Sequence, residues 1–113
     1  MDEDGYPSEE QLRDIQNWEV KGTEDLLKLF QLIQTEWWPD KHYFTIEART
    51  RKRDFGRGRY IRAVVHTVGW SGNESIIDSM MNNFMVWSLC WSSSKKGGHY
   101  VFHIPVWEKK EQV

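Results

Sequence analysis

The apolar residues of this chain change their spacing near residue 40, and this change restricts the fold more than any other feature of the sequence. Up to that point they recur every three or four positions, which is typical of the buried face of a helix. From His42 onward they alternate with polar residues, which is typical of a half-buried strand. We therefore predict an α+β domain, and seven tryptophans supply large side chains for its core.

Three helices are predicted. The first runs near residues 9–20 after an N-cap at Ser8, and the second begins at an N-cap on Thr23 and ends at residues 38–40, which include a proline. The third and most apolar helix covers residues 73–92. Residues 92–98 are predicted to form a flexible, basic exit from this helix.

Three strands complete the predicted element order α-α-β-β-α-β. They form a small antiparallel three-stranded sheet with the helices packed on one face, and a turn at residues 54–58 joins the first two strands. We expect the strand order 2-1-3, with the last strand beside the first; the alternative places it beside the second, as a parallel pair. Pro105 favours a sheet edge or the end of a strand.

A chain of 113 residues fits one domain, which we place at residues 8–107 between a flexible acidic tail (1–7) and a flexible C-terminal tail (108–113). Cys90 cannot form an internal disulfide, and its apolar neighbours predict a buried thiol in a reducing compartment. No apolar stretch approaches the roughly 18 residues of a membrane span, and the acidic start is unlike a signal peptide. These features predict a cytoplasmic protein.

The net charge of −2 conceals a strong asymmetry. Residues 1–40 carry eleven acids and three bases, whereas residues 41–113 carry six acids and twelve bases. This distribution can steer an anionic partner to the basic part, or the acidic helices can neutralise that part within the fold.

Seven cations fall within residues 49–62, and Phe55 and Tyr60 lie between them. In a strand, Arg49 and Arg51 share a face and can follow a phosphate backbone, which predicts salt-sensitive nucleic-acid binding. The alternative is a solvated hairpin tip whose charges discourage aggregation or pair with the acidic helices.

The loop at residues 69–74 ends a strand and opens a helix. Ser71 and Glu74 fit a capping box, in which the serine hydroxyl accepts a hydrogen bond from the backbone N–H of Glu74. The loop glycines would also let a phosphate or carboxylate approach the helix N-terminus, and Trp70 can contact a partner there. The Gly97-Gly98 loop plays a matching role, so the two loops are expected to bracket one edge.

His66, His99 and His103 are predicted on one side of the sheet. Two strand residues four positions apart are separated by roughly 13 Å, too far to share a metal ion. The His-x-Ser/Thr pattern of two-histidine phosphoesterases and the Gly-x-Ser-x-Gly nucleophile elbow are both incomplete. We therefore predict no metal, no cofactor and no catalytic residue, and a small hydrolase ranks third among the candidate functions.

A longer pattern joins Gly69-Trp70-Ser71-Gly72-Asn73-Glu74 to Asn83-Phe84, Trp87, Trp91 and the run from Lys96 to Phe102. This pattern, within residues 59–104, resembles small uncharacterised proteins encoded by bacteriophages. The resemblance implies expression in an infected bacterium and binding to a host factor, with anti-defence activity as one candidate role. It implies no catalytic residue, because that family has no established activity.

The leading hypothesis is a non-enzymatic accessory protein that binds an anionic ligand, either nucleotide-like or nucleic acid. The second is an inhibitor of a host protein, whose acidic N-terminal helices mimic nucleic acid. A homodimer is also expected, because the small sheet carries exposed aromatic residues. The predicted ligand-binding residues are Arg49, Arg51, Arg57, Arg59, Arg62, His66, Trp70, Ser71, His99 and Tyr100.

Overall fold

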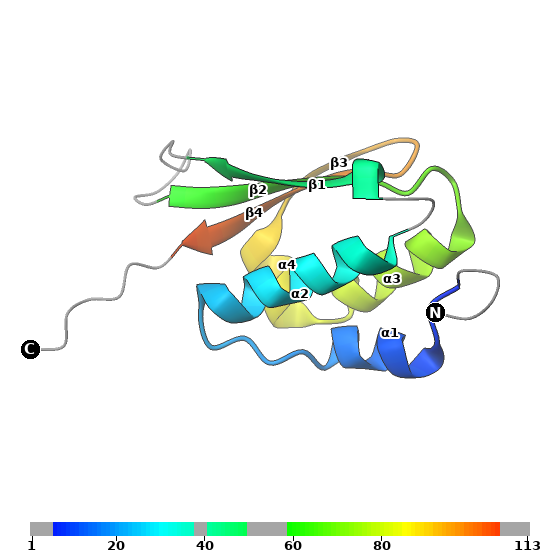
Figure 1. The fold of residues 1–113 in the computed structure, drawn as a ribbon, viewed down its shortest axis with the longest axis horizontal. Coiled ribbons are helices and arrows are strands. Elements are labelled where there is room, and N and C mark those ends of the chain that lie inside the picture. The colour runs from blue at the N-terminus through cyan, green and yellow to red at the C-terminus, as the bar shows by residue number, and fades with distance from the viewer. Residues whose placement is uncertain (1–5, 38–40, 50–58, 107–113) are drawn as a thin grey trace, which may run out of the picture.

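A computed structural model describes residues 6–37, 41–49 and 59–106, in which the α-helices lie on one face of a single sheet (Figure 1). The helices are α1 (Glu9–Gln16), α2 (Thr23–Glu36), α3 (Ser71–Met81) and α4 (Phe84–Cys90), with a short 3-10 helix η1 (Lys41–Tyr43) before the sheet. The strands are β1 (Phe44–Arg49), β2 (Arg59–His66), β3 (Trp91–Lys95) and β4 (His99–Val106). The predicted α+β class, with helices on one face of an antiparallel sheet, is confirmed.

The sheet contains four strands in the order β1-β2-β4-β3, and each neighbouring pair is antiparallel. The prediction of three strands in the order 2-1-3 is therefore wrong, because the last strand lies beside β2 and not beside β1. The parallel alternative is not formed either, since the additional strand β3 reverses the chain before β4 begins. Pro105 occupies the second-to-last position of β4, at the strand end where it was expected.

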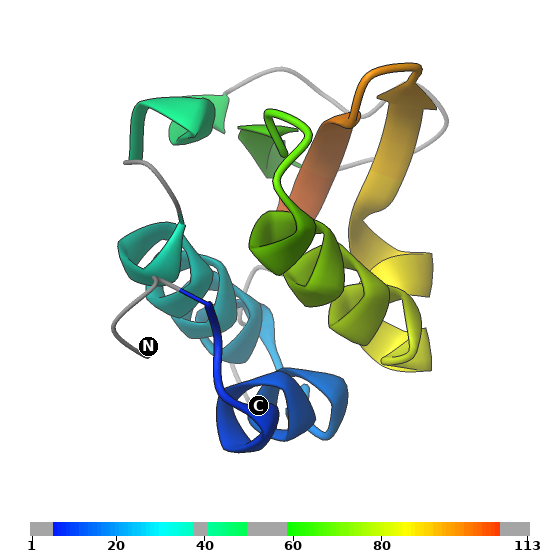
Figure 2. The ribbon, with the colours of Figure 1, turned by 90° about the vertical axis from the view of Figure 1, so that its right-hand side faces the viewer.

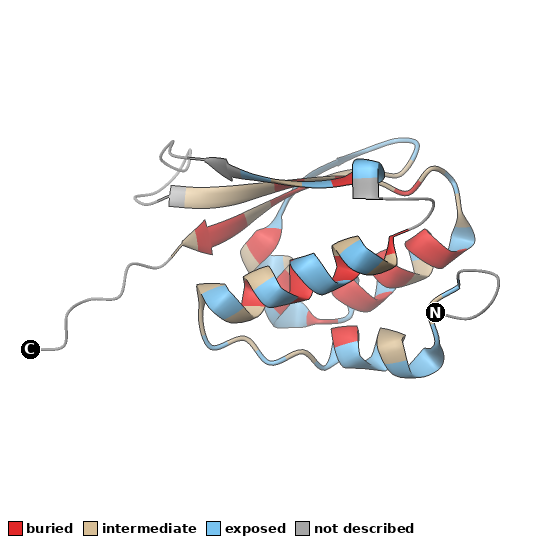
Figure 3. Cartoon of the chain, in the orientation of Figure 1, coloured by how far each residue is buried: buried red, intermediate tan, exposed pale blue. Residues whose placement is uncertain are grey.

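β3 occupies the segment that was predicted as the end of a helix and a flexible exit. The helix stops at Cys90, and Trp91 takes an extended backbone conformation (φ −61°, ψ 128°). Gly97 and Gly98 have positive φ values of 91° and 80°, and they turn the chain into β4. All of β3 is exposed (Figure 3), so no apolar alternation marks this strand in the sequence.

The helix predicted over residues 73–92 is in fact two helices, because the chain breaks at Asn83. The side-chain oxygen of Asn83 accepts a hydrogen bond from the backbone N–H of Val86 at 3.2 Å, which caps α4. Its amide nitrogen donates to the carbonyl oxygens of Ile15 at 3.0 Å and Trp18 at 3.1 Å. One buried side chain therefore starts α4 and ties it to the end of α1.

α1 ends at Gln16 and is shorter than the predicted helix over residues 9–20. Ser8 caps it as predicted, because its hydroxyl accepts from the backbone N–H of Gln11 at 3.0 Å while the Gln11 side chain accepts from the Ser8 N–H at 2.7 Å. After the helix, the ring N–H of Trp18 donates to the carbonyl of Asp25 at 2.8 Å. This contact holds the connecting segment against α2 instead of allowing another helical turn.

α2 has Gly22 as its N-cap, so the prediction that Thr23 caps this helix is wrong. The Thr23 hydroxyl donates instead to the carbonyl oxygen of Pro105 at 2.9 Å. That hydrogen bond ties the start of α2 to the end of β4. The other end of α2, at Glu36, precedes residues 38–40 as predicted.

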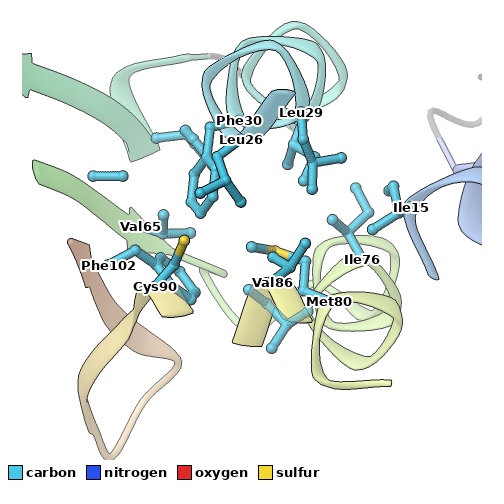
Figure 4. Close-up of a cluster of buried hydrophobic side chains, with 14 of the residues drawn as sticks. Ile15, Leu26, Leu29, Phe30, Val65, Ile76, Met80, Val86, Cys90 and Phe102 are labelled. Atoms are coloured by element: carbon cyan, nitrogen blue, oxygen red, sulfur yellow. The ribbon is translucent and has the colours of Figure 1, made fainter. Parts of the chain in front are cut away.

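The core lies between the sheet and the helices, with Phe30 of α2 near its centre (Figure 4). The Phe30 ring centroid lies 6.2 Å from that of Phe44 and 5.4 Å from that of Phe102. Trp87 continues this aromatic cluster, 5.5 Å from Phe102 and 6.2 Å from Trp91 at the surface. The predicted burial of the Cys90 thiol is confirmed, and the strand residues predicted for the core that are buried are Phe44, Ala63, Val65, Phe102 and Ile104. Val101, predicted on the opposite face of the last strand, is buried as well, so burial does not alternate along β4.

Glu36 is a partly buried acid at the end of α2, and the loss of hydration on burial raises the pKa of its carboxyl group. Gln11 donates to one carboxylate oxygen at 2.9 Å, and the other oxygen has no hydrogen-bond partner among the described residues. Folding therefore favours the protonated form. The stability that this form contributes is complete below the ordinary pKa of the group and is lost as the pH rises through the raised pKa.

We expect Glu36→Gln to raise Tm at pH 7 and to leave it unchanged at pH 3, where Glu36 is already neutral. The gain in unfolding free energy should be below about 1 kcal/mol, because solvent screens a partly exposed group. Thermal denaturation followed by circular dichroism measures both values, and Glu10→Gln, at an exposed position of α1, is the matched control. An equal effect at the two pH values would contradict burial of the charge as the cause.

Candidate functional site

The sheet face that points away from the helices is the candidate functional site, and we call it the open face (Figure 1). Along β1, β2 and β4 its residues alternate with those of the helix-covered face, and directly paired residues of neighbouring strands share it. Val101 and Pro105 are buried although they occupy open-face positions. The open-face positions whose side chains the structure describes are Thr45 and Glu47 of β1; Tyr60, Arg62, Val64 and His66 of β2; His99, Val101, His103 and Pro105 of β4; and Ser93 and Lys95 of β3.

Aromatic and imidazole rings gather on the open face in two groups. His66 is paired with His99 across β2 and β4, and their ring centroids lie 5.7 Å apart in an edge-to-face arrangement. Tyr43, at the end of η1, lies 6.5 Å from His66. The ring of Tyr60 stacks on that of His103 at 4.1 Å, with 29° between the planes. The face therefore presents flat rings near both ends of β2.

The His66 imidazole is oriented by the turn that follows β2. Its Nδ1 accepts a hydrogen bond from the backbone N–H of Val68 at 3.1 Å, which leaves the proton of the neutral ring on Nε2. Val68 and Gly69 both have positive φ values, 51° and 72°, and such a conformation is strained for a β-branched residue. The strained turn thus fixes which nitrogen of His66 can donate to a ligand.

Cations lie beside both groups of rings. Arg62 is paired with His103 on β4, and Lys95 on β3 is paired with His99. The Nε of Arg62 is buried and has no hydrogen-bond partner among the described residues. Glu47 lies opposite Arg62 on β1 and is the one acid among the described open-face positions. The face consequently has an excess of positive charge.

The acidic helices α1 and α2 lie on the side of the sheet opposite the open face, and α1 is the farther of the two from the sheet (Figure 1). Glu9, Glu10 and Asp14 of α1 are exposed. No ion pair among the described residues joins these helices to the sheet; Lys21 pairs with Glu19 at 3.9 Å, between two exposed side chains. The two charged parts are therefore separated in space, and the described residues give no support to neutralisation of one by the other.

Trp70 and Ser71 lie away from the open face, at the start of α3. The Trp70 ring centroid is 4.7 Å from that of Tyr6, whose hydroxyl lies 3.1 Å from the Ser71 hydroxyl. The Trp70 ring also occupies the space that a Cβ at Gly72 would need. These two residues thus pack the N-terminal segment onto α3.

The predicted capping box at Ser71 is wrong. The N-cap of α3 is Trp70, which makes no side-chain cap hydrogen bond, and Glu74 donates its backbone N–H to the Trp70 carbonyl at 3.1 Å. The buried Asn73 side chain donates instead to the carbonyl of Thr67 at 3.2 Å. The helix therefore begins one residue earlier than the box requires, because the turn at residues 67–70 leads directly into it.

The two glycine loops, predicted to stand at the two ends of one helix, meet each other at one end of the sheet. The backbone N–H of Thr67 donates to the carbonyl of Gly98 at 2.9 Å. Tyr100, predicted at the ligand, occupies a position on the helix-covered face, because it is paired with the buried Val65. Its ring lies 6.2 Å from that of Trp87, and so it belongs to the aromatic cluster of the core.

The structure brings three predicted site residues together on the open face: Arg62, His66 and His99. Arg49 and Arg59 are paired with Tyr60 and Val106 at the strand ends. The predictions for Arg51 and Arg57, and for the turn at residues 54–58, lie outside the described residues. Site prediction from the sequence missed Tyr60, His103, Tyr43 and Lys95; the first two could have been found from their alternation with buried strand residues.

Within the described segments, no three His, Cys, Asp or Glu side chains lie close enough together to hold a metal ion. None of the described helices has the length and apolar character to cross a membrane. No family model, no curated protein and no solved structure matches the chain. The resemblance to bacteriophage proteins stays a prediction.

Proposed function

We propose that this protein is a non-enzymatic binding protein that holds an anionic ligand, a nucleotide or a nucleic acid, on the open face of its sheet. The observation that carries the proposal is the placement of rings and cations together on a face that the described helices leave uncovered. In the bacteriophage setting that the resemblance implies, such a protein would act in the cytoplasm of the infected cell, with anti-defence activity as one role.

The chemistry of the open face suits both parts of a nucleotide. Arg62 and Lys95, at open-face positions of β2 and β3, attract phosphate groups. The Nε2 proton of His66 gives a further donor. Bases can stack on the exposed parts of the tyrosine and histidine rings, and such stacking contributes about 1–3 kcal/mol per base.

The test is titration of a fluorescently labelled mixed-sequence 12-nucleotide single-stranded DNA, the corresponding duplex and ATP, each at 20 and 200 mM salt. We expect binding at low salt that weakens as salt rises. Arg62→Gln should weaken it by roughly three- to tenfold, because one phosphate contact is lost. Lys28→Gln, at an exposed position of α2, makes the same change in net charge on the opposite side of the molecule and should have no effect.

Absence of binding to every probe at 20 mM salt would overturn the proposal, as would an equal loss of affinity in the two variants.

The second candidate function, an acidic inhibitor of a host protein, is favoured by the exposed acids of α1. Asp14→Asn separates the two functions: it should leave oligonucleotide binding unchanged or slightly tighter, whereas it should weaken an interaction that depends on the acidic helix.

A further inference from the structure

One edge of the sheet combines an open strand with exposed apolar side chains. β3 is the last strand on its side among the described residues, and α4 lies beside it (Figure 2). We call β3, together with the exposed residues Phe84 and Met85 at the start of α4 and Met81 at the end of α3, the β3–α4 edge. The outer backbone groups of an edge strand are a template for pairing with another strand.

The apolar surface at this edge is large for a chain of this size. Phe84 is 78 % exposed and Trp91 is 44 % exposed, and Met81 and Met85 are also exposed. At roughly 200 Å² for a large aromatic side chain, the two rings alone leave about 250 Å² in solvent. The two methionines, which are 43 % and 49 % exposed, and the exposed strand β3 add to this area. Patches of this kind mark protein interaction sites.

The charge of the β3–α4 edge indicates the partner. No acid occurs between Asp78 and Glu108, and the cations of this segment, Lys95 and Lys96, lie at its hairpin end. In a two-fold symmetric dimer, residues on the axis meet their own copies, so a surface without charges at its centre avoids like-charge repulsion there. The other edge strand, β1, carries the charged Glu47 within the strand, whereas β3 carries its charge, Lys95, at its last residue and has a register shift between Trp91 and Ser93. A charge within a strand opposes edge pairing more directly than one at its end.

We propose that two copies of this chain pair through the β3–α4 edge and form a symmetric dimer. The two β3 strands run antiparallel about a two-fold axis perpendicular to the sheet, and the apolar side chains of α4 from both copies cover each other beneath it. The sheet then continues through eight strands. An antiparallel pair keeps corresponding faces on the same side, so the two open faces join into one surface.

The test is sedimentation of the full chain from 1 to 200 μM. The wild type should form a dimer as concentration rises, and Phe84→Ser should weaken the dimer at least tenfold, as expected of a central aromatic contact. Leu32→Ser, which removes a 36 % exposed side chain from α2, should have no effect. Since Phe84 is mostly exposed, its variant should keep the wild-type Tm and circular dichroism spectrum, which confirms folding.

Hydrogen exchange locates the contact. Amides of β3 should exchange more slowly at 200 μM than at 1 μM in the wild type, and at the same rate at both concentrations in Phe84→Ser. A monomer at 200 μM would overturn the proposal, as would a dimer that Phe84→Ser leaves intact or one whose β3 amides gain no protection. Ligand titration with Phe84→Ser tests the open face separately, so failure of one proposal leaves the other to be judged on its own.

Discussion

Asn83→Asp should lower the free energy of unfolding by about 3 kcal/mol, because it removes both hydrogen bonds that the side-chain amide donates and places a buried carboxylate beside two carbonyl oxygens. In the folded chain, the Asn83 amide nitrogen donates to the carbonyls of Ile15 and Trp18, and its oxygen caps α4. Aspartate retains an oxygen for the cap and loses both donated hydrogen bonds. Equilibrium urea denaturation of the variant measures the change.

Asn82→Asp is the matched control, since it makes the same chemical change one residue earlier at an exposed position. We expect it to cost less than about 1 kcal/mol, from a negative charge near the C-terminus of α3. Equal losses in the two variants would show that the added charge, and not the lost donors, destabilises the chain. If Asn83→Asp lowered the free energy of unfolding by no more than the loss of a helix cap does, Asn83 would not stabilise the fold by bridging α4 to Ile15 and Trp18.

Gly98→Ala should cost about 3 kcal/mol or more, while Gly97→Ala should cost about 1 kcal/mol, close to the penalty for a left-handed conformation. Both glycines have positive φ in the turn between β3 and β4. A Cβ at Gly97 meets nothing within 4 Å, whereas one at Gly98 collides with the Thr67 hydroxyl oxygen. The difference between the two variants therefore isolates the steric contact.

A double mutant checks this explanation. Thr67→Ala removes the nearest colliding atom and leaves the Thr67 Cβ position 3.1 Å from the added methyl group. The double mutant Gly98→Ala/Thr67→Ala should therefore lose less unfolding free energy than the sum of the losses in the two single mutants. Strict additivity of the two single effects in urea denaturation would mean that the collision is not what destabilises Gly98→Ala.

The predicted strands around Phe44, Ala63 and Phe102 were found in the structure because burial on one face imposes alternation on the sequence. The same signal placed Arg62, His66 and His99 on one side. β3 carries no such signal, since it is exposed throughout and its pairing with β4 supplies the structure. The glycines of the β3–β4 turn, Gly97 and Gly98, are visible in the sequence, but glycine is equally common just after the C-terminus of a helix.

Distant contacts account for the other errors. Nothing local to Asn83 indicates that its side chain reaches Ile15 and Trp18, which lie more than sixty residues away. The packing of Trp70 on Tyr6 is equally remote in sequence. The local pattern at residues 71–74 therefore suggested a capping box and a partner site. Tertiary packing instead determined where α3 starts and where the Trp70 ring lies.

The position of β4 between β2 and β3 also determines when the sheet can form during synthesis. Ala63 is paired with Phe102, about forty residues later, so β2 has no neighbour on that side until the last strand leaves the ribosome. Pairings between such distant segments form slowly, because a long loop must close first. Until then, the β1–β2 pair of the nascent chain exposes an unpaired edge on β2, together with the apolar face on which Phe30 packs in the folded protein. The central place of β4 therefore makes the newly made chain dependent on protection from aggregation until β4 has emerged and paired.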